Sequence, residues 1–138
     1  MRKRTRAREF ALQILYQRDI THDPYDTVLA NFWAGRDQEQ IDENLKGFTE
    51  QLVKGTLENL TFIDAKITQY ATNWQLARMP VVDRNVLRLG CFELIFCQDI
   101  PPKVSINEAV ELAKKYSGPE AGKFVNAILD KIKQDIKK

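Results

Sequence analysis

Hydrophobic residues recur every three to four positions along most of this chain, which is the spacing of amphipathic α-helices. The pattern of the first segment predicts a helix over roughly residues 4–19. One face of that helix carries Ala7, Phe10, Ala11, Ile14 and Leu15. A second row at i+4 spacing lies on a different face and consists of Leu12, Tyr16 and Ile20. Either this helix is central and packed on both sides, or the second row contacts a partner.

Start and stop signals divide the rest of the chain into further helices. Asp23 and Pro24 read as an N-cap and a first helical residue, and Gly35 ends the helix that they open. Residues 36–40 are polar and predict a loop. A helical pattern then runs from about residue 40 to 70, with a break expected at residues 59–61. The break predicts two consecutive helices or one bent helix.

The second part of the chain predicts three more helices. The helix from about residue 80 to 96 is apolar on nearly every face, so we expect it at the centre of a bundle. Gly90 within it indicates a close helix crossing. Ser105 and Glu108 have the spacing of a capping box, which predicts a helix start at Ser105. A last helix begins at residue 119 or 120, and the connection over residues 73–80 contains Trp74, which we expect to be at least partly buried.

The predicted fold is therefore all-α: a bundle of about seven helices in a single domain over residues 1–138. We expect an N-terminal half (1–72) and a C-terminal half (73–138) that share one core. No apolar run approaches the ~18–20 residues that cross a bilayer, and no secretion signal follows the basic start. A cytoplasmic location without membrane contact is the default expectation.

Residues for catalysis are scarce. His22 is the one histidine, so neither a nucleophilic triad nor a metal site is expected, and no phosphate-binding loop motif occurs. Cys91 and Cys97 are read as core thiols. The carboxylates sit at helix positions that we expect to be solvated, so none should have a shifted pKa. We expect no enzyme, no cofactor and no metal.

The charge distribution points to binding instead. The net charge is only +2, but Arg2, Lys3, Arg4, Arg6 and Arg8 place five positive charges in the first eight residues. The other 16 basic and 19 acidic residues give the remainder a charge of −3. Arginine matches phosphate geometry and stacks on bases, so Arg4, Arg6 and Arg8 are candidate RNA ligands. Tyr70 and Phe124 could stack bases, although either could equally be core. The structural alternative is a solvated basic terminus that binds nothing.

Four segments carry a resemblance to a known family. They are RTRAREFALQILYQ, NWQLARMPVVDRNVLRLGCFEL, IPPKVSINEAVELAKKY and GKFVNAILDKI. Together they resemble the NusB family of transcription antitermination factors over residues 4–20 and 73–132. The resemblance implies an all-helical two-part bundle that binds boxA-containing single-stranded RNA together with the small-subunit ribosomal protein NusE. It implies that this complex loads onto RNA polymerase and promotes read-through, chiefly on ribosomal RNA operons.

The resemblance also assigns residues to the two partners. It implies RNA contacts for Arg4, Arg6, Arg8, Tyr70 and Phe124. It implies a protein-partner face formed by Tyr16, Ile20, Asp83, Arg84 and Leu87, the last three on an exposed part of the central helix. Thr5 interrupts an arginine triplet found in some relatives, which lowers the charge density and puts affinity rather than RNA binding in question.

Two rival functions and one open property remain at this stage. The protein could be an adaptor that binds only proteins, or the detached RNA-recognition head of a methyltransferase. Retention of RNA, lost at high salt, argues against the adaptor. Recovery of a ribosomal protein and polymerase argues against the methyltransferase head. Some relatives are implied to form homodimers that bury the arginines, and the apolar rows of the first helix permit that here.

Overall fold

The computed structural model describes residues 2–36 and 39–136, and these residues form seven α-helices, a short 3-10 helix and no strand. The elements are α1 (Lys3–Thr21), α2 (Tyr25–Ala34), α3 (Glu43–Glu58), α4 (Leu60–Tyr70), η1 (Leu76–Arg78), α5 (Val81–Phe96), α6 (Pro102–Tyr116) and α7 (Pro119–Ile136). The all-α bundle predicted from the sequence is confirmed. The division into halves at residue 72 stays a prediction.

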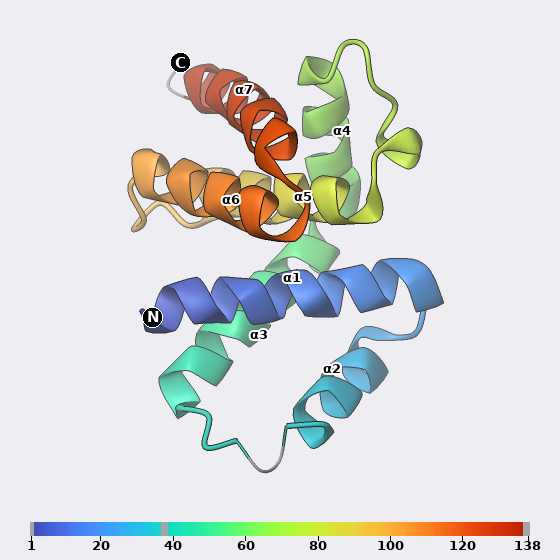
Figure 1. Cartoon of the computed structure of the whole chain (residues 1–138), viewed down its shortest axis with the longest axis vertical. Helices are drawn as coiled ribbons and strands as arrows, with labels where there is room; N and C mark the ends of the chain where they lie inside the picture. Colours follow the sequence, from blue (N-terminus) through green and yellow to red (C-terminus); the bar gives the residue numbers. More distant parts are fainter. Residues whose placement is uncertain (1, 37–38, 137–138) are drawn as a thin grey trace.

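Helix α5 is the centre of the bundle, as its apolar faces predict. It packs against α1, α3, α4, α6 and α7 (Figure 1). Gly90 permits a close approach to two of these helices: a Cβ there would lie 2.7 Å from Cδ1 of Leu129 on α7 and 3.3 Å from Cβ of Ala109 on α6. The predicted close crossing at Gly90 is therefore confirmed.

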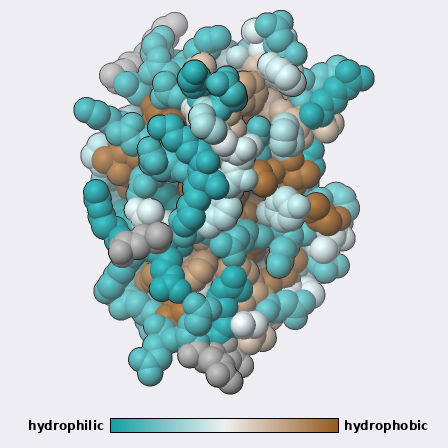
Figure 2. All heavy atoms as spheres, in the orientation of Figure 1, coloured by the Kyte–Doolittle hydropathy of each residue, from teal (hydrophilic) through white to brown (hydrophobic). Residues whose placement is uncertain are grey.

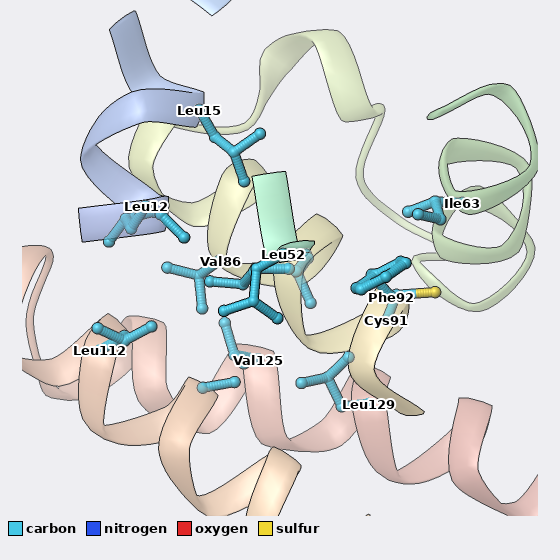
Figure 3. Close-up of a cluster of buried hydrophobic side chains, with 14 of the residues drawn as sticks. Leu12, Leu15, Leu52, Ile63, Val86, Cys91, Phe92, Leu112, Val125 and Leu129 are labelled. Carbon is cyan, nitrogen blue, oxygen red and sulfur yellow. The ribbon is translucent and has the colours of Figure 1, made fainter. Parts of the chain in front are cut away.

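The core is formed by side chains from nearly every helix. Figure 3 shows Leu12 of α1, Leu52 of α3 and Leu112 of α6 converging on Val86 of α5. Leu12 is buried, so the second row of α1 belongs partly to the core. Further along the same row, Tyr16 and Ile20 are 39% and 53% exposed. The core interpretation is therefore correct for Leu12, and contact of Tyr16 and Ile20 with a partner stays a prediction.

The two cysteines are buried and unpaired, as expected of core thiols. Burial is the main cause of their raised pKa values, about 12 for Cys91 and about 11 for Cys97. Such thiols carry little thiolate at neutral pH and are correspondingly unreactive.

Helix boundaries follow the sequence signals in most places. The expected break is found at Asn59, which separates α3 from α4 and donates its side-chain amide to the carbonyl of Gly55. Helix α3 starts at Glu43 rather than near residue 40, because the Asp42 carboxylate accepts hydrogen bonds from the backbone amides of Asn44 and Leu45 in the first turn. The predicted loop before it includes residues 37 and 38, which lie outside the described residues.

The capping-box prediction at Ser105 is wrong. Helix α6 begins at Pro102, and Ser105 lies one turn inside it, fully buried. Its hydroxyl donates to the Glu93 carboxylate on α5 instead of capping a helix. Proline's fixed φ suits a first helical position, which explains the earlier start. The end of α6 follows the prediction, and Gly118 takes the positive φ of 136° that the turn into α7 requires.

Trp74 is less buried than its size suggests. It remains 55% exposed in the connection before α5, although its ring lies 5.9 Å from that of Phe124, measured between centroids. None of the described helices is both long and apolar enough to span a membrane.

Candidate nucleic-acid interface

The basic arm, residues 2–8, forms the start of α1 and lies between two surface hollows. The α3 hollow has a volume of about 470 Å³ and is lined by Lys3, Arg4, Glu43, Asn44, Leu45, Gly47, Phe48 and Gln51. The α6 hollow, of about 520 Å³, lies between the arm and the connection from α5 to α6 and includes Asp99, Pro101 and Val104. The arm is therefore a ridge with open space on both sides.

Arg4 and Arg6 are exposed, as predicted for RNA ligands. The Arg4 guanidinium carbon lies 4.4 Å from the centroid of the Phe48 ring, a cation–π contact that holds the side chain against α3. Arg6 pairs with Glu39, with Nη2 at 2.9 Å from Oε1. Exposed pairs of this kind contribute at most about 1 kcal/mol, so a phosphate can compete for Arg6.

Arg8 contradicts the expectation that the arm arginines lie in solvent. Its side chain is only 3% exposed and forms a bidentate pair with Glu93 of α5, with both N–O distances at 2.8 Å. Its Nη1 also lies 3.0 Å from Oε1 of Glu108 on α6. Burial opposes the charge, but the hydrogen bond and negative charge of Glu93 outweigh it, so the pKa of Arg8 is raised. Arg8 ties three helices together and is not a free RNA ligand.

Arg8, Glu93 and Glu108 form a mostly buried group of charges, which we call the Arg8 cluster. Two hydroxyl groups donate further hydrogen bonds to its carboxylates. Ser105 donates to Oε1 of Glu93 at 3.1 Å, and Thr5 donates to Oε1 of Glu108. The expectation that every carboxylate is solvated is wrong for Glu93, whose side chain is 2% exposed. Buried charges persist when they are paired and hydrogen-bonded, and here each one is.

The two aromatic candidates lie away from the arm. The arm borders the C-terminal end of α5, whereas Phe124 lines a hollow with Pro80 and Asp83 at its N-terminal end. The 16 residues of α5 span about 24 Å. Figure 1 shows the two ends on opposite sides of the molecule. The structure does not bring Phe124 to the arginines, so one RNA strand would have to follow α5 to contact both.

Tyr70, at the end of α4, is half-buried rather than fully in the core. Loss of hydration and a hydrogen bond with the Asp135 carboxylate raise the pKa of its hydroxyl. The Tyr70 hydroxyl also accepts from Nε2 of Gln69 at 3.2 Å. The Tyr70 side chain packs against the hydrophobic core and is only partly exposed.

The predicted protein-partner residues of α1 are accessible. Tyr16 lines a mainly apolar hollow of about 370 Å³ between α1, α5 and α6, together with Val82 and Tyr116. Ile20 lies one turn further along the same row of α1 and is more exposed. Exposed large apolar groups that line a hollow are typical of a binding surface. In Figure 2 hydrophilic residues dominate the visible face, and hydrophobic residues gather in separate small patches.

The partner residues predicted on α5 differ in accessibility. Leu87 and Asp83 are both buried, so the assignment of these two residues to an exposed face is wrong. Arg84 is mostly buried and paired with Asp19, with Nε at 2.7 Å from Oδ2. Asp83 is 7% exposed and lies in the hollow of about 370 Å³ that also contains Trp74 and Phe124. Among the residues that the structure describes, Oδ1 of Asp83 has no hydrogen-bond partner.

Comparison with known proteins identifies the family. The model of the NusB family matches residues 5–134. The chain belongs to the NusB family. The transcription antitermination protein NusB of Thermodesulfovibrio yellowstonii is 40% identical over 96% of this chain and 93% of its own length. That of Anaeromyxobacter dehalogenans is 47% identical, covering 94% of this chain and 89% of its own length.

Solved structures of NusB share the fold. NusB of T. maritima superposes with a TM-score of 0.87 at 39% identity, covering 96% of this chain and 91% of the other. The NusB chain found with NusE in a complex with double-stranded RNA has a TM-score of 0.87 at 30% identity and covers 98% of both chains. The part of this NusB family member that the structure describes contains no cluster of three or more His, Cys, Asp or Glu side chains able to hold a metal.

Sequence reasoning missed two residues of the candidate interface, Glu93 and Phe48. A signal existed for Glu93: it lies between Phe92 and Leu94 on a helix that is apolar on nearly every face. Arg8 falls on the i+4 row of Leu12, so each charge occupies an apolar row, which indicates a buried pair. Phe48 carried no such signal, because its contact with Arg4 forms between two different helices and leaves no local pattern in the sequence.

Proposed function

We propose that this protein is a transcription antitermination factor. It binds boxA RNA together with the ribosomal protein NusE and promotes read-through by RNA polymerase, chiefly on ribosomal RNA operons. The observation that carries the proposal is its likeness, over nearly the whole chain, to a NusB seen with NusE and RNA. In this proposal the protein acts by binding and has no catalytic step.

The RNA surface that we infer begins at the exposed arginines. Arg4 and Arg6 bind phosphates, because their guanidinium groups are accessible and positively charged. Arg8 does not, because its side chain is buried and paired with Glu93. Phe124 and Tyr70 add aromatic surface further along the molecule, where unstacked bases can lie on the rings. The salt-dependent affinity of this surface comes from the arm.

The protein-partner surface that we infer joins two neighbouring regions. Tyr16 and Ile20 supply exposed apolar area on α1, and Asp83 supplies a negative charge within a hollow at the start of α5. An unpartnered carboxylate oxygen in a mainly apolar hollow favours a long cationic side chain, such as lysine or arginine of a basic ribosomal protein.

Cooperative binding tests the proposed function. Because NusE and RNA are proposed to bind as one complex, NusE should increase the affinity for a boxA oligonucleotide by about tenfold or more, in the range typical of coupling between sites. Fluorescence anisotropy of labelled RNA, with and without purified NusE, measures the effect. Binding of NusE without any binding of RNA would instead support the protein-only adaptor.

The partner surface makes a separate prediction for Asp83→Asn. The substitution keeps the shape and removes a charge that lacks a hydrogen-bond partner at Oδ1, so thermal stability should not fall. Affinity for NusE should fall at least about tenfold, because a desolvated charge pair across the interface is lost. Isothermal calorimetry measures the affinity, and Asp130→Asn on α7 is the matched control. Equal affinity of both variants would exclude Asp83 from the interface.

A further inference from the structure

The α3 hollow offers groups that phosphate binding does not use. Besides the arm cations, its wall carries the carboxylate of Glu43 and the side-chain amides of Asn44 and Gln51, all three exposed. Carboxylates repel phosphates, but they accept hydrogen bonds from the amino groups of bases, and amides can both donate and accept. The chemistry of this wall therefore suits the edge of a base.

A stacking platform lies in the same hollow. The ring of Phe48 is buried and carries the guanidinium group of Arg4 over one face, at 4.4 Å from the ring centroid. A guanidinium is planar and stacks readily, so its free face can accept a second planar group. Stacking on arginine planes is one of the ways in which proteins hold single-stranded bases.

Gly47 keeps the hollow open. It lies in the first half of α3 and is exposed, and a Cβ at this position would meet no atom within 4 Å. The other glycine of α3, Gly55, is required by packing, because a Cβ there would lie 2.2 Å from the Phe92 ring. Glycine inside a helix is destabilising, and packing does not require it at position 47. Any longer side chain would project into the space beside Arg4.

We propose that the α3 hollow receives one unstacked base of the single-stranded RNA whose phosphates bind the arm. The base stacks on the Arg4 plane, and its edge contacts Gln51, Asn44 and Glu43. Because the wall contains a carboxylate and two amides, it favours a base with an exocyclic amino group, such as adenine or cytosine, over uracil. This inference rests on the proposed RNA-binding function.

Two substitutions of Gly47 test the inference: Gly47→Leu fills the hollow, and Gly47→Ala is the control that leaves it open. Gly47→Ala and Gly47→Leu both replace glycine by strong helix formers, so both should raise the melting temperature by about 2–4 °C. Alanine leaves the hollow open, and RNA affinity should stay at the wild-type level. Leucine fills it, and affinity for a boxA oligonucleotide should fall about fivefold or more, the effect of losing one stacked base. A folding defect cannot explain weaker binding by the more stable variant.

A scan with abasic RNA identifies the base itself. Oligonucleotides with one base removed at each position should reveal one position where wild-type affinity falls and Gly47→Leu shows no further loss. Equal wild-type and Gly47→Leu affinities for intact RNA would overturn the inference. So would a Gly47→Leu loss that is the same at every abasic position. If the wild type binds no RNA, the proposed function fails instead, and the two failures are distinguishable.

Discussion

Arg8→Ala is expected to unfold the protein at a much lower temperature than the wild type. The substitution leaves the Glu93 carboxylate buried without its bidentate partner, at a site that is 2% exposed. Removing one member of a buried ion pair costs about 3–5 kcal/mol. For a domain of this size that loss lowers the melting temperature by about 10–20 °C. Thermal melts followed by circular dichroism measure it.

The control for Arg8 lies one turn earlier on the same helix. Arg4→Ala removes an exposed arginine, so its effect on stability should stay within about 0.5 kcal/mol apart from the contact with Phe48. A double replacement, Arg8→Met with Glu93→Leu, should recover much of the loss, because hydrophobic residues of similar volume often substitute well for buried pairs. If Arg8→Ala melts like the wild type, the Arg8 cluster does not hold the helices together.

Arg4→Ala combined with Arg6→Ala should weaken RNA binding strongly without unfolding the protein. Both side chains are exposed, and each can donate charge-assisted hydrogen bonds to a phosphate. Such bonds contribute about 1.5–3 kcal/mol, which corresponds to at least about tenfold in affinity for each arginine. The surface pair between Arg6 and Glu39 reduces this only slightly. Anisotropy titration with a boxA oligonucleotide measures the loss.

A matched pair of cations elsewhere separates local from general charge effects. Lys114 on α6 and Lys131 on α7 are exposed, and Lys114 has an acidic neighbour in Glu111 just as Arg6 has Glu39. Lys114→Ala with Lys131→Ala removes the same total charge. An equal loss of RNA affinity in both double variants would mean that net charge, and not the arm, determines binding.

The helices could be predicted from the sequence because their signals are local. Periodicity and boundary signals placed the helices, leaving α3 and α4 open as two helices or one bent helix. Gly90 and Asn59 marked a crossing and a break that the structure contains. Ser105 misled because a capping box and a buried serine within a helix have the same local sequence. The helix that contains Ser105 starts at Pro102, and the serine bonds across to α5. Only tertiary packing distinguishes the two cases.

The site could be predicted less well, because burial of a charged residue depends on its partner. Arg4, Arg6 and Arg8 look alike in a basic segment, yet only Arg8 faces Glu93, 85 residues away. Leu87 was assigned to the surface through the family resemblance, although the apolar faces of α5 already predicted a buried helix. There the helix-wide pattern was the better guide.

The salt dependence of RNA binding tests the central claim most directly. For a single strand, log affinity falls with log salt concentration with a slope of about −0.7 for each phosphate neutralised. Arg8 is buried, so Arg4 and Arg6 are the accessible arginines of the arm besides Arg2. Titrations at several salt concentrations should show that Arg4→Ala with Arg6→Ala flattens the slope by about 1.4 units relative to wild type. An unchanged slope and affinity in a normally folded double variant would contradict the account, and the arm would then be a solvated basic terminus.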